Sequence, residues 1–126
     1  MKKILLSLLI ISVAFIGCKK DDDASLRGEW EISQTVYKYY INNRLDDTET
    51  EQGDGTRLDF QSGGRLVITD AFGDQTIADY SINGDEVEID GVEFEIRNLT
   101  DDSATLYVKD DYGAGEYEEL FIYLER

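Results

Sequence analysis

The stretch Val-Glu-Ile-Asp-Gly-Val-Glu-Phe-Glu-Ile-Arg, residues 87–97, alternates apolar with charged side chains on both sides of an Asp-Gly pair. Alternation with a period of two is typical of a strand that buries one face. An Asp-Gly pair between two such runs is typical of a two-residue hairpin turn. We therefore expect two antiparallel strands here, Glu86 to Asp90 and Val92 to Arg97.

The same alternation recurs on both sides of this hairpin, with turn residues every eight to twelve positions. Further strands are expected at Glu29 to Tyr40, Thr56 to Gln61, Arg65 to Asp70, Gln75 to Ile82, around Leu106 and around Ile122. The stretch Asn42 to Gly55 is rich in acidic residues and has almost nothing to bury, so we expect a long mobile loop there. The sequence thus predicts an all-β fold, an eight-stranded antiparallel up-and-down barrel that leaves no exposed edge.

Length and composition limit the function. A chain of 126 residues is enough for one domain. With 28 acidic and 12 basic residues its formal net charge is -16, which argues against nucleic-acid binding. It has no histidine and a single cysteine, and regular strands turn Glu86, Glu88, Glu93 and Glu95 outward, so we expect no enzyme activity and no cofactor.

Acidic clusters invite a calcium interpretation, because hard cations prefer several oxygen ligands. The candidates are the acidic residues between Asp46 and Asp54 and the pair Asp110-Asp111. Neither matches the spacing of a calcium-binding loop. We therefore expect a solvated acidic surface and no metal site.

The N-terminal segment has the features of a targeting signal. Lys2 and Lys3 precede an apolar run, residues 4–16, which is too short to cross a hydrocarbon core of about 30 Å. Phe15-Ile16-Gly17-Cys18 resembles the lipobox of bacterial lipoproteins, although Phe15 stands where leucine is usual. This resemblance implies a signal peptide at 1–17, a lipidated Cys18 that anchors the protein in a bacterial membrane, a tether at 18–24 and a domain at 25–126.

The charged segment Lys19 to Asp23 resembles the tether of surface lipoproteins of Bacteroidetes-type bacteria. It implies a lipid-anchored protein of the cell envelope, in the outer membrane and exposed at the cell surface. A plain solvated linker explains the same residues.

Leu26-Arg27-Gly28-Glu29-Trp30 resembles the G-x-W signature of lipocalins, and the chain end from Leu120 to Arg126 resembles their last strand. Together they resemble the small lipocalin-like lipoproteins of Bacteroidetes-type bacteria. The resemblance implies that Trp30 closes one end of the barrel, with Arg126 over its indole, and that the barrel carries or senses a small apolar molecule. No convincing second lipocalin motif is present.

Two interpretations of the barrel remain open. A ligand cavity would be lined by Gln34, Phe60, Tyr80 and Phe94, with Gln34 and Tyr80 as the main inward polar groups. An eight-stranded barrel is also narrow enough to be filled by its own side chains. In that case the domain would have no internal ligand.

The competing function is a surface interaction module. If Trp30 lies opposite Leu124 and Leu106 lies opposite Ile122, then two outward pairs follow: Tyr107 with Phe121, and Tyr37 with Tyr117. With Tyr39 and Tyr123 they would form an aromatic stripe that contacts an envelope or extracellular protein or a glycan. Alternatively, tyrosines are there because their shape suits a pleated surface.

Overall fold

The computed structural model describes residues 26–126, which form nine strands. Their bounds are β1 (Gly28–Ile41), β2 (Arg44–Gln52), β3 (Arg57–Gln61), β4 (Arg65–Thr69), β5 (Gln75–Asn83), β6 (Glu86–Ile89), β7 (Val92–Arg97), β8 (Ser103–Gly113) and β9 (Glu116–Glu125). Among these residues no helix is long and apolar enough to span a membrane.

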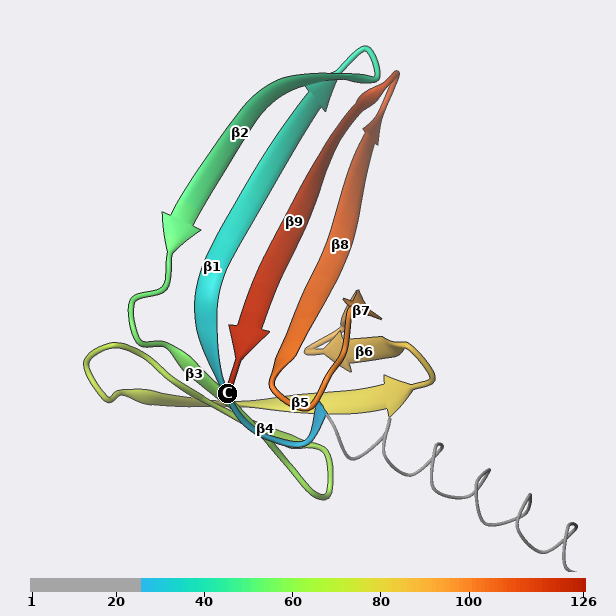
Figure 1. The fold of residues 1–126 in the computed structure, drawn as a ribbon. Helices are drawn as coiled ribbons and strands as arrows, with labels where there is room; N and C mark the ends of the chain where they lie inside the picture. Colours follow the sequence, from blue (N-terminus) through green and yellow to red (C-terminus); the bar gives the residue numbers. More distant parts are fainter. Residues whose placement is uncertain (1–25) are drawn as a thin grey trace, which may run out of the picture.

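Eight of the strands close into a ring. The hydrogen-bonded order runs from β1 through β3, β4, β5, β6, β7 and β8 to β9, which pairs back with β1 (Figure 1). Every pairing is antiparallel. The predicted up-and-down barrel is therefore confirmed, and it is consistent with a calycin-like fold. The remaining strand, β2, lies outside the ring.

The hairpin expected at residues 86–97 is present. β6 and β7 are joined through Asp90 and Gly91, and Ile89 pairs with Val92 across the turn. Both turn residues have a positive φ, 49° for Asp90 and 85° for Gly91. This is the backbone of a type I′ turn, whose twist matches that of the flanking strands.

The expectation of a mobile loop at 42–55 is wrong. Residues 44–52 form β2, which pairs with β1 from Gln34 to Ile41. The turn is Asn42-Asn43, with φ values of 53° and 61°, and asparagine tolerates this left-handed backbone better than most residues. All nine β2 residues are exposed, so pairing depends on backbone hydrogen bonds and needs no apolar side chains.

Strand β1 changes partners along its length. Gly28 to Glu31 pair with β3, whereas Gln34 to Ile41 pair with β2, and β9 follows the opposite edge. Beyond the ring, four strands continue as one sheet in the order β2-β1-β9-β8 (Figure 1). We call this part the sheet extension: β2 with residues 34–41, 108–113 and 116–121.

A β-bulge at Ser33 sets which residues face out of the extension. Before the bulge, Ile32 lies opposite Leu124 in place of the expected Trp30, and the register then shifts by one residue between Ile32 and Gln34. A shift of one residue moves later side chains to the other face of a strand. Gln34 therefore lies opposite Tyr123 on the outer face, and its assignment to the barrel interior is wrong.

The hydrophobic core lies inside the ring. Its buried apolar side chains are Leu26, Trp30, Leu58, Phe60, Leu66, Ala78, Tyr80, Val87, Ala104, Leu106 and Leu124. Apart from Leu26, which precedes β1, they come from the alternate strand positions that the period of two predicts. Half-buried side chains, among them Ile32, Phe94 and Ile122, pack against this cluster. The inner surface of the barrel thus continues without a break onto one face of the sheet extension.

Candidate functional site

Trp30 and Arg126 meet at the seam of the ring. The indole is fully buried and its Nε1 donates a hydrogen bond of 2.8 Å to the Leu26 carbonyl. The Arg126 guanidinium lies 4.0 Å above the Trp30 ring and donates to the carbonyls of Arg27 (2.6 Å) and Asp101 (2.7 Å). These contacts join the first strand, the last strand and the turn before β8, which is a structural role.

The residues proposed to line a cavity are divided between three environments. Phe60 and Tyr80 are buried and pack edge to face, with ring centroids 5.1 Å apart. The Tyr80 hydroxyl donates to the Gln61 carbonyl at 2.5 Å, so its polar group already has a partner. Phe94 is half-buried at the border of the core, and Gln34 is on the outer face. A hollow of about 410 Å³ adjoins Tyr80 and Ile82 near the turn at Gly63-Gly64.

The outer face of the sheet extension and the adjoining barrel wall carries five aromatic side chains, which we call the outer aromatic face: Tyr40, Tyr107, Tyr117, Phe121 and Tyr123. The expected opposition of Tyr107 and Phe121 is confirmed, with ring centroids 5.0 Å apart. The expected opposition of Tyr37 and Tyr117 is wrong, because Tyr40 lies there instead. The rings of Tyr40 and Tyr117 stack at 4.3 Å.

Cations cover several of these rings. Lys38 lies 5.3 Å from the centroid of Phe121, and Lys109 lies 4.2 Å from that of Tyr117. Arg97 lies 3.6 Å from the centroid of Tyr107. Cation–π contacts of this kind hold flexible basic side chains against the sheet. The outer aromatic face therefore combines aromatic rings with three cations in a protein that carries a large net negative charge.

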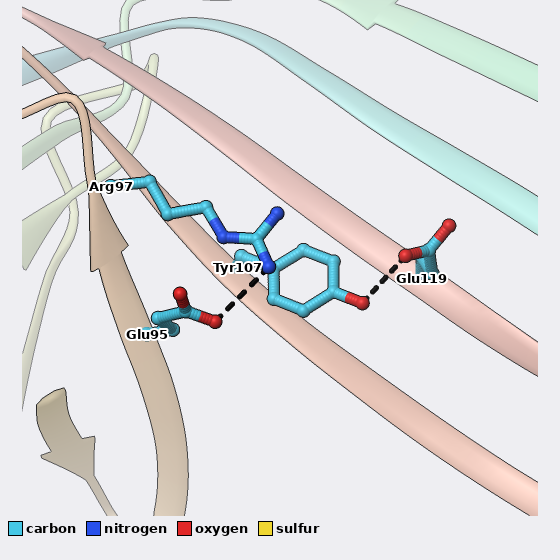
Figure 2. A network of polar contacts seen from close by, with 4 residues as sticks. All are labelled: Glu95, Arg97, Tyr107 and Glu119. Carbon is cyan, nitrogen blue, oxygen red and sulfur yellow. Dashed lines mark hydrogen bonds and ion pairs between the residues drawn. The ribbon is translucent and has the colours of Figure 1, made fainter.

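A polar network crosses the same face (Figure 2). Arg97 is bonded to Glu95 at 3.0 Å while its guanidinium covers Tyr107, and the Tyr107 hydroxyl donates to Glu119 at 2.5 Å. Burial and the bond to Glu119 raise the pKa of Tyr107 to about 12. A bond to the same carboxylate, with some burial, raises the pKa of Tyr40 to about 12. Burial alone would raise the pKa of Glu119. The hydrogen bonds from both tyrosines and the positive charges of Lys38 and Arg97 together have a larger effect, so the pKa of Glu119 is lowered.

The opposite face of the extension is different in character. Four carboxylates and two tyrosines lie on this opposite face, which we call the inner acidic face: Tyr37, Tyr39, Asp47, Glu49, Glu51 and Glu118. They line a hollow of about 320 Å³. Burial comes first among the causes that raise the pKa of Tyr37, followed by the charges of Glu51, Glu118 and Glu49. This face concentrates negative charge beside two tyrosines, and Tyr37 and Tyr39 belong here rather than to the outward stripe.

Within residues 26–126 no group of three or more Asp, Glu, Cys or His side chains is arranged to hold a metal ion. Cys18 and the segments assigned to a signal peptide and tether, 1–17 and 18–24, lie outside the described residues. So does residue 25, the first of the predicted domain.

The sequence did not point to Tyr40 as a member of the outer aromatic face, nor to Lys38 and Glu119, which contact its rings and hydroxyls. The Asn42-Asn43 pair was the available signal, because it marks the end of β1 and the start of a second strand. Nothing in the sequence marked the bulge at Ser33. Comparisons of the chain with protein-family models, with curated proteins and with solved structures found no match.

Proposed function

We propose that this protein is a binding module of the bacterial cell envelope that captures a protein or glycan partner through its outer aromatic face. The observation that carries the proposal is the grouping of aromatic rings on one side of the sheet extension and the adjoining barrel wall. Tyr40 stacks on Tyr117, and Phe121 contacts both Tyr107 and Tyr123. A sheet normally buries at least one face against another layer. A face with aromatic side chains and no covering layer in the described chain favours a contact surface.

The composition of this face supports the same conclusion. Aromatic residues and arginine are enriched at protein interfaces, because they combine a large contact area with polar groups. The cations over the rings also provide hydrogen-bond donors for a glycan, and the hydroxyl oxygens of Tyr40 and Tyr107 can accept hydrogen bonds from it. The ring contacts and the hydrogen bonds to Glu119 hold the side chains in place before a partner arrives, which lowers the entropic cost of binding.

The proposal can be tested by replacing Tyr107 and Phe121 with serine and measuring binding to a glycan array and to immobilised envelope proteins. We expect the double variant to keep the circular dichroism of the barrel and to lose binding. Phe72→Ser is the matched control, because Phe72 is 91% exposed in a turn away from this face. Binding that persists in the double variant would exclude the outer aromatic face.

A small apolar molecule in the barrel is the second candidate function. The hollow beside Tyr80 and Ile82 supports it, because these two side chains give the hollow an apolar part, next to Arg27 and Ser81. With Phe60 and Tyr80 in contact, such a molecule would sit in this hollow. Mass spectrometry of lipids that co-purify with the protein tests this, and a preparation that is repeatedly free of lipid would contradict it.

Anchoring through Cys18 and membership of the lipocalin-like lipoproteins of Bacteroidetes-type bacteria belong to the same proposal. The lipobox-like Phe15 to Cys18 and the G-x-W element at Gly28 to Trp30 support them. Cys18→Ser should move the protein from the membrane fraction to the soluble fraction of cells. Protease treatment of intact cells then tests whether the domain is exposed at the outer surface.

A further inference from the structure

The outer edge of β2 ends the sheet. β2 is the terminal strand of the order β2-β1-β9-β8, and no strand among residues 26–126 pairs with its other edge. An unpaired edge presents a row of backbone N–H and C=O groups that can accept another strand. All nine β2 residues are exposed, so an incoming segment would reach this edge without displacing any side chain from the core.

The side chains of β2 divide into two chemically distinct rows. Asp47, Glu49 and Glu51 lie on the inner acidic face, opposite Tyr39, Tyr37 and Thr35. Between them, Thr48, Thr50 and Gln52 lie on the other face and carry no charge. None of the three carboxylates forms an ion pair within the described chain, where the ion pairs are Arg57–Glu29 and Arg97–Glu95. The edge therefore presents negative charge at every second position.

This spacing specifies the partner. Residues directly opposite each other on neighbouring strands have Cβ atoms about 5 Å apart, and opposite charges there are favourable. A strand added to β2 would place every second side chain beside Asp47, Glu49 or Glu51. Lysine or arginine at those alternate positions fits, whereas the edge of a second copy would bring acid against acid.

We propose that β2 docks an extended basic segment of a protein partner, which adds to the sheet as a further strand and places alternate lysine or arginine side chains against Asp47, Glu49 and Glu51. The hollow of about 320 Å³ beside Tyr37 and Tyr39 gives the aliphatic stems of those side chains an aromatic surface. The net charge of -16 steers a basic segment toward the domain. This site uses the opposite face from the outer aromatic face and does not depend on it.

The test is to titrate the full-length protein with a capped nine-residue peptide of alternating threonine and lysine. We expect binding by calorimetry and slower hydrogen exchange of the β2 amides that do not bond to β1. The same peptide with methyl groups on alternate backbone nitrogens keeps its charge but cannot form the ladder, so it should not bind. Equal binding of the methylated peptide, or unchanged β2 exchange, would overturn the proposal.

A pair of charge-matched variants tests the acidic row. Glu49→Gln with Glu51→Gln should weaken peptide binding about tenfold, since two cross-strand charge pairs are lost. Glu88→Gln with Glu93→Gln is the control, because these exposed residues face each other on β6 and β7 and the change in net charge is the same. An equal loss in both variants would show attraction to an acidic protein in general and would overturn docking at β2.

Discussion

At the scale of single residues, Trp30 and Arg126 show how one contact closes the barrel. The indole brings a large apolar surface into the core and donates to the Leu26 carbonyl, so its polar atom is satisfied. Arg126 covers the ring and bonds to carbonyls of two segments far apart in the sequence. Gly28 allows this approach, because a Cβ there would lie 3.2 Å from the Arg126 guanidinium.

Replacing Arg126 with alanine should lower the free energy of unfolding by about 2 kcal/mol, since a cation–π contact and charged hydrogen bonds are lost together. Urea unfolding followed by the fluorescence of the single tryptophan measures this effect. Arg65→Ala removes an exposed arginine from β4 and should leave the midpoint nearly unchanged. Equal midpoints for Arg126→Ala and the wild type would contradict the closing role.

Glu119 is the residue on which the outer aromatic face depends. Tyr107 and Tyr40 keep their protons to a pKa of about 12 in the folded state, against an ordinary value of 10.0. Raised tyrosine pKa values stabilise the fold below pH 10, and this contribution is lost as the pH rises from 10 toward 12. The lowered pKa of Glu119 stabilises the fold at pH values above 4.5, the ordinary pKa of glutamate. This stabilisation is lost as the pH falls through the lower pKa that Glu119 has in the folded state.

Glu119→Gln should therefore bring the pKa values of Tyr107 and Tyr40 back toward 10.0. The ultraviolet absorbance of tyrosinate, followed during an alkaline titration, measures the change. Glu88→Gln, on β6, is the control and should leave both tyrosines titrating near pH 12. If the two variants titrate alike, the hydrogen bonds to Glu119 do not hold these protons.

At the scale of elements, the junction between ring and extension is set where β1 bulges. The Ser33 hydroxyl donates to the Tyr123 carbonyl at 3.1 Å, and the Ser33 carbonyl accepts the Gly53 N–H at 2.8 Å. Gly53 follows β2 and passes directly against this backbone. A Cβ at Gly53 would lie 2.1 Å from the Ile32 carbonyl oxygen, so no larger residue fits without moving β2 or β1.

Gly53→Ala should therefore destabilise the protein by about 3 kcal/mol, at the upper end of the cost of overpacking. Urea unfolding gives the free energy, and hydrogen exchange shows whether the β2 amides open first. Gly73→Ala is the control: its φ of 86° costs about 1 kcal/mol, and no atom lies within 4 Å of the added carbon. If Gly53→Ala lowers the free energy of unfolding no more than Gly73→Ala does, Gly53 is not packed closely against the backbone of β1.

At the scale of the whole molecule, a packed ring supports a thin sheet with two unlike faces. The outer aromatic face combines aromatic rings with cations, and the inner acidic face concentrates carboxylates. The chain carries a net charge of -16, so its acidic groups repel one another in the compact state. Most of these acidic groups are exposed, so dissolved salt can screen the repulsion between them.

Raising sodium chloride from about 0.01 M to about 0.15 M shortens the Debye length from about 30 Å to about 8 Å. We expect Tm to rise by about 4 °C, because screening relieves repulsion in the folded state. Glu88→Gln with Glu93→Gln should raise Tm at low salt and reduce its dependence on salt, since these like charges lie opposite each other. A Tm that falls with salt would mean that attractive pairs dominate.

The period of two in the sequence determined the ring. Runs such as 87–97 specify which side chains face inward, and Asp90-Gly91 specifies the turn, because both signals are local. The opposition of Tyr107 and Phe121 followed from the assumed register of the last two strands, in which Leu106 lies opposite Ile122. The closed barrel and one pair of the outer aromatic face could therefore be predicted without a structure.

Only the tertiary structure decided the rest. β2 carries no apolar alternation, because both of its faces are exposed and its pairing is made by the backbone. The bulge at Ser33 depends on contacts with Tyr123, ninety positions away, and with Gly53. One extra residue at the bulge turns every later side chain of β1 to the opposite face of the sheet. Gln34 therefore points outward, and Tyr37 lies on the inner acidic face. Alternation fixes which residues share a face, but only the pairing of distant strands decides which face that is.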